Sequence, residues 1–257
     1  MPINYAKLLE GKNAVITNGN TDVGRSIAVK FAMHGANVAV GTDTVDPGAG
    51  SNILLADIRQ YSPDSFIHQC DLKDKTSVDD FCKTVNERFS VVNVLVNNPY
   101  IEIKPDLLSA CEDDDDLMMQ VYQRSIVQIM RAFWAGMLAT GDCSVIDISS
   151  NTVYKGMNSL DSAANGVIGG LVRIAASEGA HKNIRANEIL ADKGIYLKQP
   201  GHYPLKNRDE CYWEDIEGVT NTALFLASEM SSYITGTSIT VDGGAARSLL
   251  NIFGKDK

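Results

Sequence analysis

Short apolar runs alternate along the chain with longer segments of helical periodicity. The apolar runs have the length and the β-branched composition of buried strands, and each ends at a turn or at the start of a helical pattern. We predict strands at Asn13–Thr17, Asn37–Gly41, Ser65–Cys70, Val92–Asn97, Cys143–Ser149, Ile184–Leu190 and Ser238–Val241.

Apolar residues at helical spacing fill most of the segments between these runs. The predicted helices are Val23–His34, Thr76–Phe89, Leu117–Leu138, Leu160–His181 and Ile216–Ala227. Because buried strands that alternate with helices form a parallel sheet covered on both faces, we predict an α/β fold. We expect a doubly wound, Rossmann-type sheet of about seven strands. No repeat or linker-like tract divides the sequence, so we expect a single domain over residues 1–257.

The predicted helix Leu160–His181 contains an unusual number of small residues. Gly166, Gly169 and Gly170 interrupt its apolar band, although a glycine in a helix interior costs up to about 1 kcal/mol. Small side chains allow another helix to approach closely. We therefore expect a subunit contact here, and packing on the sheet alone is the alternative.

The charge balance excludes several classes of partner. Lys and Arg number 23 and Asp and Glu 32, so the net charge is −9. Without a basic cluster, such a chain is a poor ligand for nucleic acids or anionic membranes. No apolar run reaches the roughly 20 residues of a membrane span, and the first residues lack the layout of a signal peptide. The five scattered cysteines favour reduced thiols, so we expect a cytoplasmic protein.

Metal ligands are not evident in the sequence. The four histidines and five cysteines have no zinc-like spacing, and we expect no metal site. The acidic run Glu112–Asp116 precedes the predicted helix Leu117–Leu138. We interpret it as a solvated helix N-terminus stabilised by the helix dipole, and a divalent-cation site is the alternative.

Short motifs follow the predicted strands in a fixed order. They are Thr17 with Gly24-Arg25, Cys70-Asp71-Leu72, Leu95-Val96-Asn97-Asn98, Ile148-Ser149-Ser150, Arg185 with Asn187, Ile234-Thr235-Gly236 and Val241-Asp242-Gly243-Gly244. With this order over nearly its whole length, the chain resembles the short-chain dehydrogenase/reductase (SDR) family. The resemblance implies a Rossmann-type fold and NAD(P)-dependent alcohol or ketone chemistry.

The family's cofactor turn reads T-G-x-x-x-G-x-G, and this chain departs from it. Asn18 and Asp22 replace two of the three glycines, whereas Gly24 is retained. Asn tolerates positive φ. Asp22 would place a negative charge at the pyrophosphate, and two charges ~4 Å apart repel by roughly 4 kcal/mol at an effective dielectric constant of about 20. Asp22 also suits the N-cap of the next helix, where it would take the amide donors of an emptied phosphate site.

Further cofactor positions differ from the family pattern. Tyr100 stands where the N-N-A-G motif has glycine, and Asp192 where a glycine follows the sixth strand. Thr42 holds the place of the acidic residue that would bind the ribose. Asn97 and Asp71 match the family, although Asp71 can equally cap a turn. We therefore expect this chain to bind no cofactor.

The first turn also has a second interpretation. Gly19, Gly24, Arg25 and Ser26 have nearly the spacing of a phosphate-binding P-loop, with Arg in place of the lysine. The other motifs favour the SDR interpretation.

The catalytic positions depart further. The resemblance places the family's Asn, Ser, Tyr and Lys on Tyr122, Ser150, Asp161 and Asn165, so only the serine is retained. Without the tyrosine no matched proton donor remains, and without the lysine nothing lowers the pKa of a phenol from about 10. We expect no catalytic residue, and Tyr154 is a candidate substitute acid.

Three functions stay open. The first is a catalytically inactive subunit that forms a heterotetramer with an active, NAD-dependent SDR paralogue in a dehydrogenase of the hydroxyacyl-CoA type. We expect helices Leu117–Leu138 and Leu160–His181 to form that interface with the strand Ser238–Val241. The second is a cofactor-independent lyase, isomerase or cyclase that uses Asp161, Ser150 and Tyr154. The third is a conventional dehydrogenase with aberrant motifs.

Overall fold

The computed structural model describes residues 4–44, 49–101, 109–151, 159–192 and 211–244. Seven strands form one sheet in the order β3-β2-β1-β4-β5-β6-β7, and each neighbouring pair is parallel. The strands are β1 (Asn13–Ile16), β2 (Asn37–Thr42), β3 (Phe66–Gln69), β4 (Val94–Asn97), β5 (Ser144–Ser150), β6 (Arg185–Ala191) and β7 (Ser238–Val241). The predicted fold class and all seven strands are confirmed, with ends that differ by one or two residues.

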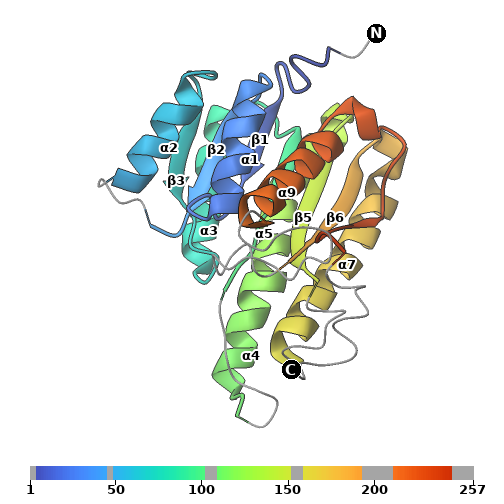
Figure 1. The fold of residues 1–257 in the computed structure, drawn as a ribbon. Helices are drawn as coiled ribbons and strands as arrows, with labels where there is room; N and C mark the ends of the chain where they lie inside the picture. Colours follow the sequence, from blue (N-terminus) through green and yellow to red (C-terminus); the bar gives the residue numbers. More distant parts are fainter. Residues whose placement is uncertain (1–3, 45–48, 102–108, 152–158, 193–210, 245–257) are drawn as a thin grey trace.

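Helices cover both faces of the sheet (Figure 1). One layer holds α1 (Asp22–Met33), α2 (Ala49–Arg59) and α9 (Cys211–Ala227). The other holds α3 (Lys75–Arg88), α5 (Ser125–Thr140) and α7 (Ser159–Gly179). Short 3₁₀ turns follow α7 and α9, at η2 (Ala180–Lys182) and η3 (Glu229–Ser231).

Helix α2 was not predicted from the sequence. Its first turn contains Gly50, Ser51 and Asn52, which are typical of a loop. The helix is stabilised by packing, because Leu54 and Ile58 lie four residues apart on its buried side. Tertiary contact therefore overrides a weak local preference.

The predicted helix Leu117–Leu138 is longer and is interrupted. It consists of α4 (Glu112–Met119), the π-helical turn η1 (Gln120–Arg124) and α5. The acidic residues Glu112–Asp115 lie inside the first turn of α4, where the helix dipole favours them, and not before the helix. The helix starts early because the carboxylate of Asp114 accepts a hydrogen bond from the Cys111 amide at 3.1 Å. No group of His, Cys, Asp and Glu in the described ranges could hold a metal ion.

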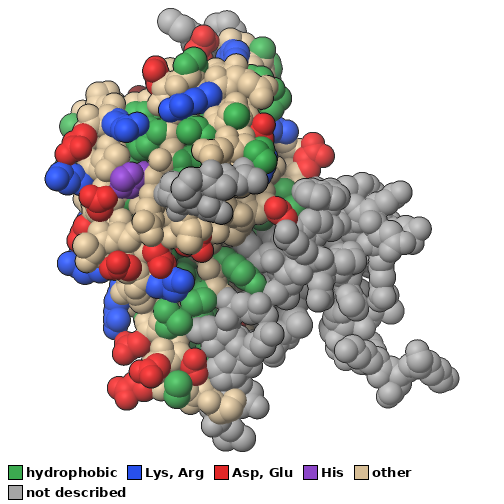
Figure 2. Space-filling view, turned by 90° about the vertical axis from the view of Figure 1, so that its left-hand side faces the viewer, with side chains coloured by type: hydrophobic (Ala, Val, Ile, Leu, Met, Phe, Trp, Pro, Cys, Tyr) green, Lys and Arg blue, Asp and Glu red, His purple; other side chains and the backbone are tan. Residues whose placement is uncertain are grey.

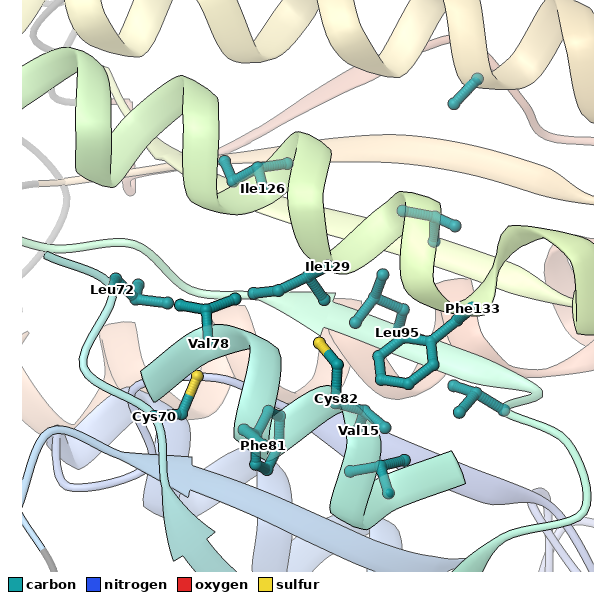
Figure 3. Packing of buried hydrophobic residues seen from close by; sticks show 14 of the residues in the cluster. Val15, Cys70, Leu72, Val78, Phe81, Cys82, Leu95, Ile126, Ile129 and Phe133 are labelled. Atoms are coloured by element: carbon teal, nitrogen blue, oxygen red, sulfur yellow. The ribbon is translucent and has the colours of Figure 1, made fainter. Parts of the chain in front are cut away.

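The core between α3 and α5 is apolar. Val78 and Cys82 of α3 face Ile126, Ile129 and Phe133 of α5 (Figure 3). Phe81, also in α3, stacks instead on the ring of His68 in β3, with 6.5 Å between the ring centroids. Burial raises the pKa of the Cys82 thiol to about 12. Cys70, Cys82, Cys111 and Cys143 form no disulfide among the described residues. Among the described helices, none is long and apolar enough to cross a membrane.

The turn between β1 and α1 needs glycine at two positions for packing. A Cβ added at Gly24 would lie 2.5 Å from the carbonyl oxygen of Asn18, and one at Gly19 would lie 2.0 Å from Cγ1 of Val40. Real Cβ atoms do not approach other atoms this closely. Gly24 is therefore required by the fold itself, whatever the turn binds.

A buried polar pair crosses the sheet beneath α5 and α7. Nδ2 of Asn97 in β4 donates to Oδ1 of Asp147 in β5 at 2.6 Å. Asp147 also lies in register with the buried Glu188 of β6. Complete burial raises the pKa of Asp147 to about 7. The hydrogen bond from Asn97 lowers this pKa, whereas the negative charge of Glu188 raises it further. Among the described atoms, Oδ2 of Asp147 and Oδ1 of Asn97 have no partner.

Replacement of Gly24 tests the packing of the turn. We expect Gly24→Ala to lower the free energy of unfolding by about 1–3 kcal/mol, because the methyl group collides with the backbone of Asn18. Gly50→Ala in α2 is the control: its Cβ meets nothing within 4 Å, and alanine favours the helix. Urea unfolding curves measure both. Equal effects of the two substitutions would contradict the packing argument.

Asp147→Asn tests the buried carboxyl. A folded-state pKa of about 7, above the ordinary value, means that the native chain binds a proton that the unfolded chain has lost. The wild type therefore loses stability as pH rises from about 4 to about 7. We expect Asp147→Asn to unfold like the wild type near pH 4 and to be more stable at pH 8, by up to about 4 kcal/mol.

Urea unfolding at several pH values checks this difference. The exposed Asp64 is the control, because Asp64→Asn at the surface should change stability by no more than about 0.5 kcal/mol. A difference between wild type and Asp147→Asn that does not vary with pH would contradict the assignment.

Candidate functional site

The turn between β1 and α1 lies at the carboxyl end of the sheet, where open α/β sheets bind ligands. Asn18 has φ 54°, so asparagine takes the left-handed conformation that the family gives to glycine. Asp22 is not the N-cap, which corrects the sequence prediction. Thr21 caps α1 because its backbone is extended and its hydroxyl accepts a hydrogen bond from the Gly24 amide at 3.1 Å. Asp22 is the first helical residue, with its charge in the first turn.

Asn98, just after β4, fastens this turn from the side. Its Nδ2 donates to the hydroxyl of Thr21 at 2.9 Å and to the carbonyl of Asn18 at 3.3 Å. Its backbone amide donates to the hydroxyl of Thr17 at 2.9 Å. Asn98 is completely buried. The turn is therefore held by groups of the chain itself.

At the adenosine end, the turn is tied to the end of β2. Nδ2 of Asn20 donates a hydrogen bond to Oδ1 of Asp43 at 2.8 Å. The hydroxyl of Thr42 donates a hydrogen bond to the carbonyl oxygen of Thr44 at 3.0 Å. Asp71 accepts a hydrogen bond from the Lys73 amide at 3.0 Å, so it caps a turn, which was the alternative left open by the sequence. The polar groups nearest to a dinucleotide's adenosine are thus engaged within the chain.

These residues do not fit an NAD(P) pyrophosphate. The family's turn brings glycine backbone and free amides to the phosphates. Here Asp22 brings a carboxylate to the first turn of α1, and the Gly24 amide is taken by Thr21. The bond between Asn20 and Asp43 joins the two segments that would hold the adenosine half.

The position of the Arg25 side chain does not support the P-loop interpretation. Arg25 stands in place of the phosphate-binding lysine, but its guanidinium pairs with Asp57 of α2 at 2.6 Å. It joins two helices and does not turn toward the loop.

The four positions that the resemblance assigns to catalysis come together. Tyr122, Ser150, Asp161 and Asn165 line one small cavity with Pro99, Tyr100 and Ser149. The described residues enclose only about 10 Å³ there, which is room for about one water molecule. The four positions therefore lie at a common site, and the space that the described residues enclose there is small.

Asn165 stands where the family has lysine, and it joins α7 to β5. Its Oδ1 accepts a hydrogen bond from the Ser150 amide at 2.8 Å, and its Nδ2 donates to the carbonyl of Asp161 at 2.8 Å. Asn165 and Asp161 are buried. Asn165 is thus committed to backbone groups on both sides of the cavity.

Tyr122 fills the place of the family's asparagine, in the π-helical turn. Its hydroxyl accepts a hydrogen bond from the Ile101 amide at 3.4 Å. Burial, followed by the negative charge of Asp161, raises the pKa of Tyr122 above its usual range. A phenol whose pKa is raised in this way is poorly matched to proton transfer near neutral pH.

Three further residues were singled out as candidates from the sequence. Asp192 is buried at the end of β6, and Tyr100 lines the cavity. Tyr154 lies outside the described residues. Sequence reasoning missed the buried carboxyl of Glu188, whose Oε1 accepts from the hydroxyl of Ser149 at 2.6 Å. The available signal was an acidic residue in a strand predicted to be buried on both faces.

Comparisons with known proteins agree with the motif order. The profile of the family described as Enoyl-(Acyl carrier protein) reductase, of the short-chain alcohol dehydrogenase type, matches residues 19–246. A 3-oxoacyl-acyl-carrier-protein reductase from Thermotoga maritima is 28% identical over 246 residues, covering 92% of this chain and 98% of that protein. One from Staphylococcus epidermidis is 30% identical over 255 residues, covering 91% and 98%.

Solved structures show the same fold. A structure assigned to the short-chain dehydrogenase/reductases, from Burkholderia xenovorans, is 25% identical with a TM-score of 0.81, covering 95% of this chain and 100% of that one. L-sorbose reductase from Gluconobacter frateurii, solved with NADPH and L-sorbose, is 20% identical with a TM-score of 0.80 and the same coverage. On the family profile and the relatives together, this chain belongs to the short-chain dehydrogenase/reductase family.

Proposed function

We propose that this chain is a catalytically inactive SDR subunit that assembles with an active, NAD-dependent SDR subunit. The observation that carries the proposal is the cavity of about 10 Å³ at the catalytic positions. The side chains that replace the family's tyrosine and lysine, Asp161 and Asn165, lie buried around it. A substrate carbonyl and a nicotinamide ring would both need far more room than one water molecule.

The chemistry of the cavity supports the same proposal. Hydride transfer to a ketone needs a proton donor with a pKa near the working pH. Tyr122 is a phenol whose pKa is raised by burial. Asn165 has no titratable group, and Ser150 has no lysine or histidine beside it in the matched positions. The NAD of the complex would therefore be bound by the active subunit.

The outer face of α7 supports the assembly part of the proposal. An added Cβ at Gly166 or Gly170 would meet nothing within 4 Å among the described residues. Ile174, one turn beyond Gly170, is 53% exposed. Packing within the chain therefore does not explain these glycines, and a helix of a partner subunit laid against this face would.

The pattern of lost and retained motifs also points to a particular kind of complex. It resembles the non-catalytic subunit of 2-(α-hydroxybenzyl)succinyl-CoA dehydrogenase, an enzyme of anaerobic toluene degradation. On that resemblance we propose a heterotetramer that acts on a hydroxyacyl-CoA. A cofactor-independent enzyme built on Asp161 and Ser150 is the alternative, and the size of the cavity does not favour it.

Cofactor titration separates this proposal from a conventional dehydrogenase. We expect the isolated chain to show no measurable binding of NAD(H) or NADP(H) by calorimetry, because Asp22 repels the pyrophosphate and Asn20 ties the turn to Asp43. Asp22→Gly alone should not restore binding, because the contact between Asn20 and Asp43 and the bulk of Tyr100 remain. A micromolar dissociation constant for either cofactor would refute the claim.

Co-purification from the native source tests the assembly. We expect an SDR chain with an intact Tyr-x-x-x-Lys motif to accompany this one. Gly170→Leu should weaken that association by about 1–3 kcal/mol, because the larger side chain overpacks the helix contact. The same substitution should not destabilise the isolated chain, since a Cβ at Gly170 meets nothing within 4 Å among the described residues.

Gly50→Leu in α2 is the matched control, because its Cβ also meets open space but lies on another helix. An unchanged complex in Gly170→Leu, or purification with no second SDR chain, would overturn the proposed assembly.

A further inference from the structure

Two buried acidic side chains are neighbours in the sheet. Figure 2 shows acidic and basic side chains spread over one surface of the molecule, which is the usual place for charged groups. Asp147 of β5 and Glu188 of β6 are exceptions, because Asp147 is completely buried and Glu188 is only 4% exposed. They lie in register with each other on adjacent strands. The chain must therefore satisfy their charges without bulk water.

The pair belongs to a row of polar side chains that crosses four strands. Asn97 of β4 is in register with Asp147, and Ser238 of β7 is in register with Glu188. We call these four residues the polar row. Residues in register on parallel strands share one face of the sheet. Val145, two residues before Asp147, packs with residues of α5 and α7, so the polar row lies on the face that these helices cover.

Glu188 has the partners that an ionised carboxylate needs. Its Oε1 accepts a hydrogen bond from the hydroxyl of Ser149 at 2.6 Å, and its Oε2 accepts one from the hydroxyl of Ser238. A Cβ added at Gly169 of α7 would lie 3.3 Å from Oε2 of Glu188 and 3.3 Å from Nη1 of Arg173, so the guanidinium lies near this carboxylate. Hydroxyl donors and a nearby positive charge stabilise a carboxylate. The negative charge of the row therefore belongs on Glu188.

Asp147 has fewer partners. Its Oδ1 accepts a hydrogen bond from Nδ2 of Asn97 at 2.6 Å, but its Oδ2 and Oδ1 of Asn97 have no partner among the described atoms. Both of these oxygens are buried acceptors, which are costly without a donor. A proton on Oδ2 of Asp147 is a donor for Oδ1 of Asn97 and satisfies both atoms at once. The raised pKa of Asp147, due first to burial and also to the charge of Glu188, agrees with this count.

Helix α7 passes directly over the polar row. It lies along β5 and β6 (Figure 1), and its backbone comes so close to Glu188 at Gly169 that a side chain there would crowd Oε2. The next residue, Gly170, is exposed, and a Cβ added to it meets nothing within 4 Å among the described residues. One turn of α7 therefore covers the row on its inner side and forms surface on its outer side.

The helix layer brings further titratable side chains to this face of the sheet. They are Tyr122 of η1 and Asp161 and Arg173 of α7. Burial, followed by the charge of Asp161, raises the pKa of Tyr122, so the phenol carries no charge near neutral pH. Arg173 lies near Glu188, and the buried residues of α5 are uncharged. An ionised Asp147 would therefore join Glu188 without a positive group of its own among the described residues.

We propose that a proton on Asp147 holds α7 against the sheet, and that loss of this proton loosens the helix over β5 and β6. We call this arrangement the proton latch. With the proton in place, Asp147 and Asn97 satisfy each other and the row carries one negative charge. Without it, two carboxylates adjoin, and the second is stabilised only where water reaches it. Water reaches the row when the turn of α7 at Gly169 lifts. The proton is exchanged with solvent, and no other covalent bond changes.

The pH range of the proton latch follows from two states of the helix. With α7 packed on the row, the pKa of Asp147 is about 7. With α7 lifted and Asp147 in water, the pKa returns to about 4. Between these values the packed state binds a proton that the lifted state has lost, so packing of α7 weakens as pH rises from about 4 to about 7 and is constant above. The latch lies within one chain and does not depend on the proposed function.

Hydrogen exchange of the isolated full chain tests the proton latch. Amide protection is measured from about pH 4 to about pH 8.5, with each rate divided by the intrinsic rate at that pH. We expect protection around Gly169 in α7 to fall by up to about tenfold per pH unit until about pH 7 and then to level off. Helix α3 (Lys75–Arg88) is the internal reference, because it does not cover the row.

Asp147→Asn removes the titration and keeps the shape of the side chain. Its amide nitrogen can donate to Oδ1 of Asn97 at every pH, as the protonated acid does. Protection of α7 in this variant should not depend on pH. Asp64→Asn, at an exposed aspartate, is the matched control and should keep the pH dependence of the wild type.

Infrared spectroscopy of the wild type is a second measurement, which holds even if Asp147→Asn fails to fold. We expect the carbonyl stretch of a protonated carboxylic acid that disappears with a midpoint at about pH 7.

Three results would each overturn the proton latch. They are protection in α7 that does not vary with pH or falls equally in α3, a pH dependence that persists in folded Asp147→Asn, and the lack of a carboxylic-acid band that titrates near neutral pH. None of these measurements involves a cofactor or a partner subunit. Failure here is therefore distinguishable from failure of the proposed function.

Discussion

The close approach of α1 to the turn after β1 is the constraint on which the rest of this structure depends. Because Gly24 has no side chain, the backbone of α1 can pack directly against the backbone of Asn18. Hydrogen bonds from the side chain of Asn98 hold the same turn to the end of β4. These contacts set the helix at the centre of the sheet, where β1 lies between β2 and β4. In active relatives this geometry also presents backbone to a dinucleotide, but the packing requirement exists without any ligand.

The difference between a packing role and a ligand-binding role explains which residues of the family motifs are retained in this chain. Gly24, Asn97 and Asn98 make contacts inside the chain, with the turn backbone and with the buried Asp147. Three of the four positions that the resemblance assigns to catalysis have changed, and two of them, Tyr122 and Asn165, form hydrogen bonds within the chain. Asn165, for example, holds the Ser150 amide and the carbonyl of Asp161 instead of a ribose. In the inactive subunit that we propose, a site with no substrate to admit can gain stability by satisfying its polar groups within the chain.

The sequence predicted the sheet well because its buried strands are nearly continuous apolar runs, as in NAVI from Asn13 to Ile16. It missed α2, whose helical state depends on burial of Leu54 and Ile58. It placed the four catalytic positions at one site, but it assigned the cap of α1 to Asp22 when the neighbouring Thr21 does the capping. Side-chain hydrogen bonds between distant segments, such as Asn20 with Asp43, have no periodic signature and cannot be read from the sequence.

Glycines that the fold does not need are the most informative residues on the surface. At Gly24 a side chain would collide with the chain's own backbone, so its retention says nothing of partners. At Gly166 and Gly170 a side chain would meet open space, and alanine would stabilise an exposed helix by up to about 1 kcal/mol at each. Retention of these destabilising glycines on one face of α7 is explained if another helix packs against that face.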